Sequence, residues 1–234
     1  MTCSPLLPPF HPPTPFQSVN IARTRLIPHG LSPEHFRLCE DGGYYLWVAA
    51  LYWGWEAKGL HIFVEMARRH PELRFVAYGP GGTTGIVAEV EARLRGHVKE
   101  LGNLEYRGAL LRGEEHATAF CGATAFFMPT QPTIGESFGL TVIEALSKGV
   151  PVITSTAGAP PEILEVPGRH GVSPYGAACN TLDEYERALL SFPNRTREAS
   201  LAIQQWAAAK YNEHVVVDKM LGFTLSKMEE LGYI

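Results

Sequence analysis

Short apolar runs alternate with amphipathic stretches along the chain from about residue 23 onward. Residues 44–51 form an apolar run without alternation, which is typical of a strand covered on both faces. Residues 59–70 carry apolar side chains at helical spacing and stop at Pro71, so they predict a helix. By the same criteria, further helices are predicted at 86–101, 114–121, 138–148, 182–191, 196–211 and within the last twenty residues, and further strands at 73–78, 104–106, 125–128 and 152–155.

This alternation predicts one α/β domain over residues 23–212. Strands spaced by helices favour right-handed crossovers, and therefore a parallel sheet with helices on both faces. Residues 1–22 form a Pro-rich tail that we expect to be disordered, because proline cannot donate to a helix or a sheet ladder. Residues 213–234 predict a terminal helix outside the domain.

The loops that follow the strands are the expected ligand site, because ligands of such sheets bind outside the carboxyl ends of the strands. The predicted helix that starts at Phe138 begins on the same rim. The free N–H groups and the positive dipole end of a helix start can hold a phosphate. Five loops share this rim, at residues 53–58, 79–84, 108–112, 129–135 and 155–160.

Two glutamates, Glu136 and Glu144, flank this helix start with seven residues between them. Ionised carboxylates only accept hydrogen bonds and sugar hydroxyls donate them, so a phosphate site beside two carboxylates suits a nucleotide-sugar. The spacing has a second interpretation. Glu144 and Lys148 could form a solvated i,i+4 pair contributing roughly 0.3–0.5 kcal/mol, and Glu136 could be an ordinary loop acid.

Composition narrows the class of protein. The chain has 234 residues, 45% hydrophobic and 19% charged, with a formal net charge of −4. These values suit a soluble protein of one large or two small domains, and the slight acidity argues against binding to a nucleic-acid backbone. The longest apolar run, residues 44–53, is far shorter than the ~20 residues that span a bilayer. The amino terminus has no basic patch followed by an apolar core, as a secretory signal would.

Metal and disulfide chemistry is not expected from the spacing of the cysteines and histidines. The four cysteines are scattered without C-x-x-C spacing, and the nine histidines, among them His29 and His61, lack the spacing of metal ligands. We therefore predict neither a zinc site nor a disulfide framework. We also interpret the histidines as structural and expect a reducing, cytoplasmic location.

Five segments, in order, resemble the carboxy-terminal, donor-binding half of group 1 glycosyltransferases with the GT-B fold. Residues 27–36 resemble the family's "IPNGVDPEKF" segment, and Lys58-Gly59-Leu60 resembles its "KG" loop. Residues 78–81 resemble its "GxGP" turn, residues 136–144 fit its Glu-x7-Glu signature, and residues 149–153 continue as the family does. The match covers roughly residues 25–215. It implies a single Rossmann-like domain, one half of a GT-B enzyme that transfers sugar with retention of anomeric configuration.

The resemblance also implies roles for individual residues. Glu136 would orient the hydroxyls of the transferred sugar and favour positive charge at its anomeric carbon, and Lys58 would neutralise the leaving diphosphate. Glu144 would take both ribose hydroxyls. No metal or other cofactor is implied, because Lys58 and the helix start could neutralise the diphosphate. The implied binding set for the nucleotide-sugar is Ser137, Phe138, Gly139, Leu140, Thr141, Glu144, Gly79 and Leu110, although Lys58 could be a solvated loop lysine, Gly79 a turn glycine and Leu110 core.

The sequence departs from the family after the first strand. The family's Gly-Arg-Leu, whose arginine shares the diphosphate, is replaced by Ala49-Ala50-Leu51, and the loop to Lys58 is longer and carries Trp53-Gly54-Trp55. Losing that cation should weaken donor binding or catalysis. Arg107 or Arg112 could replace it, but the spacing does not decide this.

A second departure concerns the acceptor-binding domain. In the family it precedes this half, whereas here the match is preceded by the Pro-rich tail. We expect this domain to be separate or missing. The terminal helix, which in the family packs on that domain, is then expected to expose an apolar face made of Val215, Val216, Leu221, Phe223 and Leu225. The alternatives are a non-catalytic nucleotide-sugar-binding module, or a truncated, inactive fragment. An epimerase or a phosphorylase of the same architecture is a third reading, but the extra catalytic residues it needs are not found.

Overall fold

The computed structural model describes residues 26–111, 113–192 and 195–234, so the predicted tail at 1–22 and Arg112 lie outside the described residues. Residues 28–218 form one compact unit. The described residues 26–27 and 219–234 belong to a second unit, which includes most of helix α9 (Glu213–Glu230). The compact unit carries the sheet and the candidate site, and it is considered by itself.

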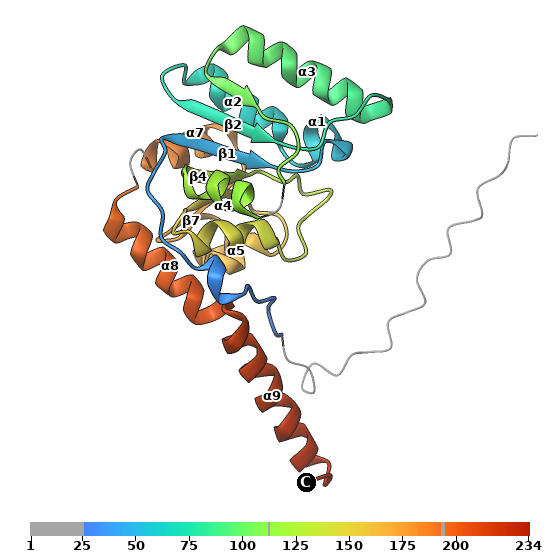
Figure 1. Ribbon diagram of the computed structural model, residues 1–234, viewed down its shortest axis with the longest axis vertical. Coiled ribbons are helices and arrows are strands. Elements are labelled where there is room, and N and C mark those ends of the chain that lie inside the picture. Colours follow the sequence, from blue (N-terminus) through green and yellow to red (C-terminus); the bar gives the residue numbers. More distant parts are fainter. Residues whose placement is uncertain (1–25, 112, 193–194) are drawn as a thin grey trace, which may run out of the picture. The chain divides into compact units, whose positions relative to one another are not determined.

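Seven strands form one sheet in the order β3-β2-β1-β4-β5-β7-β6 (Figure 1). Every neighbouring pair is parallel except β6 and β7, which are antiparallel. The chain runs outward from β1 to β3 on one side. On the other side it runs from β4 through β5 to the edge strand β6, and β7 returns between β5 and β6. The strand order therefore reverses between β1 and β4, where a crevice for ligands is expected. The strands are β1 (Tyr44–Val48), β2 (Arg74–Tyr78), β3 (Leu104–Tyr106), β4 (Ala123–Met128), β5 (Val152–Ser155), β6 (Gly171–Ser173) and β7 (Gly176–Cys179).

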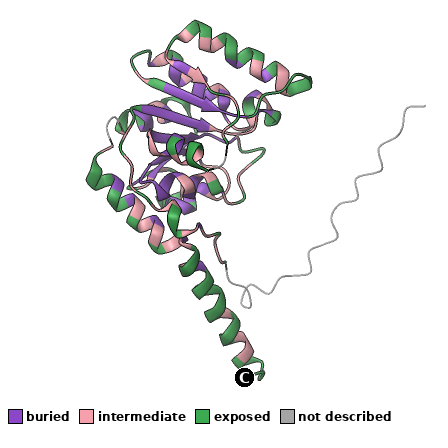
Figure 2. Cartoon of the chain, viewed as in Figure 1, coloured by how far each residue is buried: buried purple, intermediate pink, exposed green. Residues whose placement is uncertain are grey.

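Helices cover both faces of the sheet, which confirms the predicted α/β class. Successive strand residues point to opposite faces, so Phe126 packs in one apolar cluster and Phe127 in the other. One cluster contains residues of α4, α5, α6 and α8, and the other contains residues of α2, α3 and α7. The five inner strands between them, β1, β2, β4, β5 and β7, are almost wholly buried (Figure 2). The helices are α1 (Gly54–Ala57), α2 (Leu60–Arg69), α3 (Gly85–Leu101), α4 (Glu114–Cys121), α5 (Leu140–Ser147), α6 (Pro160–Ile163), α7 (Leu182–Ser191) and α8 (Arg197–Tyr211).

Two predicted boundaries at the rim of the sheet are wrong. The strand expected at 44–51 ends at Val48, and the chain turns through a 3₁₀ turn, Leu51–Trp53, into α1. The helix expected from Phe138 begins at Leu140, because Gly139 adopts a left-handed conformation (φ 84°) just before it. Both corrections move residues from regular elements into loops that face the crevice.

The expectation of no disulfide is wrong for one pair of cysteines. Cys39 and Cys121 form a disulfide, with Cα atoms 5.1 Å apart although 82 positions separate them in sequence. The fold causes this pairing, because the segment before β1 returns to the end of α4. The Arg195 guanidinium donates hydrogen bonds to the carbonyls of both cysteines and of Lys148. The remaining described cysteine, Cys179, is a buried thiol in β7.

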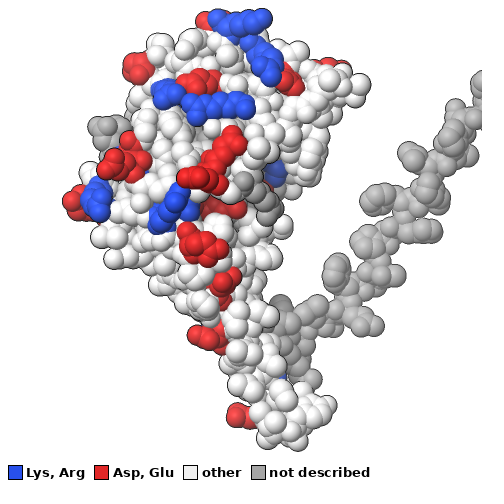
Figure 3. All heavy atoms as spheres, in the orientation of Figure 1, with Lys and Arg blue, Asp and Glu red and all other residues white. Residues whose placement is uncertain are grey.

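The described residues on the face shown in Figure 3 form no field of a single charge. Acidic and basic side chains are interspersed on the face shown in Figure 3, as the net charge of −4 leads one to expect. None of the helices in the described part of the chain is long and apolar enough to cross a membrane. Of the apolar residues expected to be exposed on the terminal helix, Leu221 and Leu225 are exposed but Val216 is buried. That expectation is wrong for Val216, because the start of α9 still packs within the compact unit.

Candidate functional site

Helix α5 begins at the rim of the sheet without a side chain to cap it. The Val142 N–H donates to the Gly139 carbonyl, whereas the N–H groups of Leu140 and Thr141, the first two helical residues, have no acceptors inside the helix and are available to a ligand. Gly139 precedes the turn, and a Cβ atom there would lie 3.1 Å from Val142 Cγ2 and 3.2 Å from Glu136 Cγ. The backbone angle therefore favours glycine at this position, and a Cβ atom would also make the two neighbouring side chains shift by a few tenths of an ångström.

Lys58 and Glu136 form an ion pair in front of this helix start. The Lys58 Nζ lies 2.8 Å from Glu136 Oε2, and the two side chains are only 14% and 23% exposed. Lys58 ends helix α1, where its carbonyl accepts a hydrogen bond from the Trp47 indole in β1. The Trp53 ring centroid lies 5.1 Å from the lysine Nζ. The structure thus brings together the two residues that the sequence marks as catalytic candidates.

The ion pair lies in a cavity of about 660 Å³ between the end of β1 and the start of α5. The loop after β1 supplies one wall, and the helix start supplies the other. His29 lies edge-on to the Phe138 ring on this second wall, with centroids 5.0 Å apart. The residues that line the cavity are His29, Trp47, Val48, Ala49, Ala50, Tyr52, Trp53, Lys58, Met128, Glu136, Ser137, Phe138, Gly139, Leu140 and Thr141.

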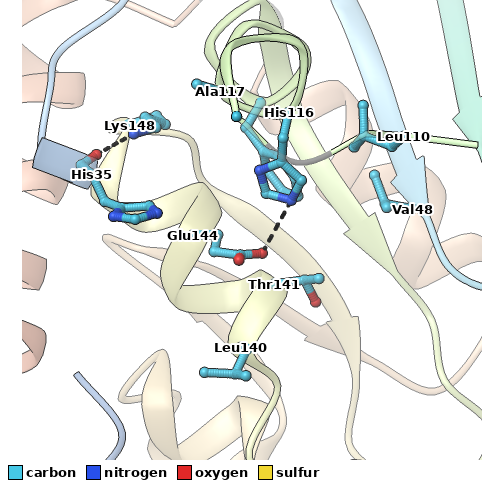
Figure 4. Close-up of a pocket in the computed structure, with 11 residues that line it drawn as sticks. His35, Val48, Leu110, His116, Ala117, Leu140, Thr141, Glu144 and Lys148 are labelled. Atoms are coloured by element: carbon cyan, nitrogen blue, oxygen red, sulfur yellow. Dashed lines mark hydrogen bonds and ion pairs between the residues drawn. The ribbon is translucent and has the colours of Figure 1, made fainter. Parts of the chain in front are cut away.

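A second cavity, of about 420 Å³, lies on the other side of the helix start and contains Glu144 (Figure 4). The Glu144 Oε2 lies 3.6 Å from His116 Nε2, so α4 faces α5 across this space. Leu110 lines the same cavity, as expected. Val48, Leu140 and Thr141 line both cavities, so the two spaces adjoin at the first turn of α5.

Lys148 closes one end of this second cavity. It is 4% exposed, and its ammonium donates to the backbone carbonyl of His35. The interpretation of Glu144 and Lys148 as a solvated surface pair is therefore wrong. Burial, together with the nearby Arg37, lowers the pKa of Lys148 to about 8, against the opposing charges of Glu144 and Glu34.

Gly79 lines neither of these two cavities. Its N–H donates to the Gly108 carbonyl, and its own carbonyl accepts from the Tyr106 hydroxyl. A Cβ atom on Gly79 would lie 2.4 Å from the Ala49 carbonyl oxygen, so this glycine allows two loops to approach closely. The role of Gly79 in binding rests on the resemblance alone.

Arg107 does not replace the arginine that is missing near Ala50. Its guanidinium donates to Glu105 and to the Tyr78 hydroxyl, and it lines neither cavity. The hydrogen bond to Tyr78, and after it the one to Glu105, raise the pKa of Arg107 further above its ordinary value, against the opposing effect of burial. Of the two arginines that the sequence suggested as substitutes, Arg107 is the one that the structure describes, and it supplies no cation here.

The sequence interpretation missed two histidines and two aromatic residues. His29 and His116 were taken as structural, yet each lines a cavity. The position of His116 just after the rim loop at 108–112 was the available signal. The aromatic pair Tyr52 and Trp53 was read as part of a strand and loop, and both rings line the larger cavity.

Comparison with known proteins shows which family the chain matches. Residues 43–192 match the model of the family described as "Glycosyl transferases group 1". The chain is 37% identical over 106 residues to a sucrose synthase of Acidithiobacillus caldus, a match covering 44% of this chain and 12% of that protein. It is 29% identical over 121 residues to the processive diacylglycerol alpha-glucosyltransferase of Acholeplasma laidlawii, covering 51% of this chain and 33% of that protein.

Solved structures show the same fold. The sucrose-phosphate synthase from Thermosynechococcus elongatus superposes with a TM-score of 0.66 at 20% identity, over 88% of this chain and 53% of that one. Anabaena Alr3699/HepE in complex with UDP and glucose superposes with a TM-score of 0.63 at 17% identity, over 86% and 56%. These neighbours have the GT-B fold. The chain spans about half the length of these structures and a third or less of the two sequence relatives.

Proposed function

The chain belongs to the group 1 glycosyl transferases, and on that basis we propose that it is the donor-binding domain of a retaining enzyme that takes sugar from a nucleotide-sugar. The observation that carries this proposal is the pair of adjoining cavities on either side of the uncapped start of α5. A nucleotide-sugar has the matching form, with two hydroxyl-rich ends joined by an anionic diphosphate.

The proposed ligand crosses the helix start from one cavity to the other. Its diphosphate would accept hydrogen bonds from the first turn of α5 and face Lys58. The ribose would lie in the smaller cavity, where the Glu144 carboxylate accepts hydrogen bonds from its two hydroxyls. The sugar would lie in the larger cavity beside Glu136. The bound UDP and glucose of the Anabaena neighbour support a ligand of this class.

The proposed reaction breaks the bond between the anomeric carbon and the phosphate oxygen, with the electron pair leaving on the diphosphate. Lys58 and the helix dipole stabilise that developing negative charge, and the Glu136 carboxylate favours positive charge at the anomeric carbon. The acceptor oxygen bonds to the same face of the sugar, and its proton passes to the departing diphosphate. The acceptor itself would be bound by a second domain.

A second candidate function is binding of a nucleotide-sugar without turnover. One feature favours it: Ala50 stands where the family has an arginine, and Lys58 is the single lysine or arginine among the described residues lining the larger cavity. One cation can hold a diphosphate, but it stabilises a leaving group less than two cations would.

A nucleotide panel tests the proposal. UDP, GDP or ADP at a hundred times its dissociation constant should raise the free energy of unfolding by about 2.7 kcal/mol in thermal-shift experiments. The variant E144Q should lose affinity for that nucleotide, because a neutral amide is a weaker acceptor for the ribose hydroxyls. E89Q, which changes an exposed glutamate of α3, is the matched control. If no nucleotide stabilises the chain, both candidate functions are wrong.

Turnover separates the two candidates. With an acceptor-binding half supplied in trans, wild-type chain should release nucleotide from the nucleotide-sugar, whereas E136Q should bind the donor and release it much more slowly. A wild-type chain that binds the donor but never releases nucleotide would favour the binding module.

A further inference from the structure

The segment between β1 and Lys58 exposes two aromatic rings. Leu51 is wholly buried and Trp55 is 9% exposed, so both fix the segment to the domain. Between these anchors, Tyr52 is 60% exposed and Trp53 is 42% exposed. This placement separates the two exposed rings from the residues that hold the segment in place.

The two exposed rings face the same cavity as the Lys58–Glu136 pair. Their centroids lie 5.3 Å apart with the planes tilted by 36°, so they form one continuous aromatic surface. The Lys58 Nζ lies 5.1 Å from the Trp53 centroid, which ties the ring to the same lysine that pairs with Glu136. A cation near the face of an indole is attracted by the ring quadrupole, so Lys58 helps to hold this orientation.

The cavity thus has an aromatic wall and a carboxylate that only accepts hydrogen bonds. A pyranose ring has the complementary form, with a face of C–H groups and an edge of hydroxyl donors. The C–H face packs against the negative face of an aromatic ring, and the hydroxyls donate to a carboxylate. We propose that Tyr52 and Trp53 stack against a pyranose ring held beside Glu136, an inference that rests on the proposed function.

Two observations favour a saccharide over a nucleobase at this wall. The Glu136 carboxylate in the same cavity offers no hydrogen-bond donor to a base, whereas it can accept hydrogen bonds from sugar hydroxyls. The nucleoside end of the ligand has its own space, because Glu144, Leu110 and His116 line the cavity across the helix start. The pyranose could belong either to the nucleotide-sugar or to the acceptor, and both present the same chemistry to the rings.

Calorimetry on the full chain distinguishes these sources. Three titrations are made on wild type, W53A and W53F. The first uses UDP and the second uses UDP-glucose. The third adds D-glucose to protein that is already saturated with UDP-glucose. The variant Y233A, which removes a 74% exposed tyrosine outside the compact unit, is the control. Thermal unfolding of each variant shows whether it remains folded. W53A should bind UDP within twofold of wild type, because the diphosphate does not touch the wall.

Loss of the indole should appear in one of the two sugar titrations. If the ring holds the donor sugar, W53A should bind UDP-glucose about three- to tenfold more weakly, and W53F should recover most of that loss. If it holds the acceptor sugar, UDP-glucose binding is unchanged and the D-glucose titration weakens by a similar factor. Either result supports the proposal that the aromatic wall contacts a pyranose ring.

Three results would overturn the inference. Unchanged binding of all three ligands by W53A would show that the rings contact no saccharide. An equal loss of UDP and UDP-glucose binding would show that Trp53 acts only through Lys58. A loss of association with the acceptor-binding half, with sugar binding intact, would make the rings a protein interface. Failure of the wild type to bind UDP, GDP or ADP is a different failure, because it contradicts the proposed function itself.

Discussion

Replacing the buried Lys148 with methionine should stabilise the chain at neutral pH, and the gain should disappear as the pH rises. The lysine is 4% exposed, and burial lowers its pKa from 10.5 to about 8. Each pKa unit corresponds to about 1.36 kcal/mol, so the buried charge costs about 3 kcal/mol below pH 8. The hydrogen bond from Lys148 to the His35 carbonyl offsets about 1 kcal/mol of that cost.

The sign of the pH dependence follows from which state binds more protons. Between about pH 8 and 10.5 the folded chain has released the Lys148 proton and the unfolded chain still holds it. The contribution of Lys148 to the free energy of unfolding of the wild type therefore rises with pH in this window. K148M lacks this contribution, so its advantage should fall from about 2 kcal/mol at pH 7 to near zero at pH 10.

Urea unfolding at pH 7, 8, 9 and 10 measures this difference. Tyr44, Tyr45 and Cys179 each have a pKa raised to about 12 by burial, and their contributions to alkaline unfolding cancel in the difference between wild type and variant. K99M, which changes an exposed lysine on α3, should show a difference that does not vary with pH. A difference between wild type and K148M that stays constant from pH 7 to 10 would refute the reasoning.

Three further predictions concern packing and the helix start. N103A removes an amide that donates to three backbone carbonyls at and just after the end of α2, each at 2.9 Å, and should lower the unfolding free energy by about 2–3 kcal/mol in urea titrations. G149A forces a Cβ atom to 2.4 Å from the Ser200 carbonyl oxygen at a φ of 73°, so its thermal midpoint should fall by about 4–8 °C; an unchanged midpoint would contradict this. In UDP calorimetry, G139A should weaken binding more than K58A does, and the reverse order would count against anion binding by the helix start.

The framework of this fold is predictable because its central strands are buried on both faces. Runs such as the one containing Phe126 and Phe127 show no alternation and read as strands of a parallel sheet. Strand β7 escaped prediction because Gly176, Ala177 and Ala178 carry no branched or aromatic side chains. Its strand conformation comes from pairing with β5, a tertiary contact that local sequence does not encode.

The candidate site is predictable only as far as strand order can place it. Lys58 and Glu136 both follow parallel strands, so the topology alone brings them to one rim. The ion pair between them, the facing of His116 toward Glu144 and the burial of Lys148 depend on side-chain packing between helices far apart in sequence. The turn at Leu51–Trp53 was hidden for a different reason, because its aromatic residues continue the apolar run of β1.

The replacement of an arginine by Ala50 changes which group must balance the charge of the proposed diphosphate. Lys58 is already neutralised by Glu136 at 2.8 Å, so the pair offers no net positive charge to an incoming anion. The remaining positive potential in this part of the site is that of the α5 start, about half an elementary charge concentrated on the free N–H groups of its first turn. Those groups can approach a phosphate closely because Gly139 has no Cβ atom. If the diphosphate draws Lys58 away, it also releases the Glu136 carboxylate toward the sugar, so phosphate binding and the orientation of the sugar become linked through one ion pair.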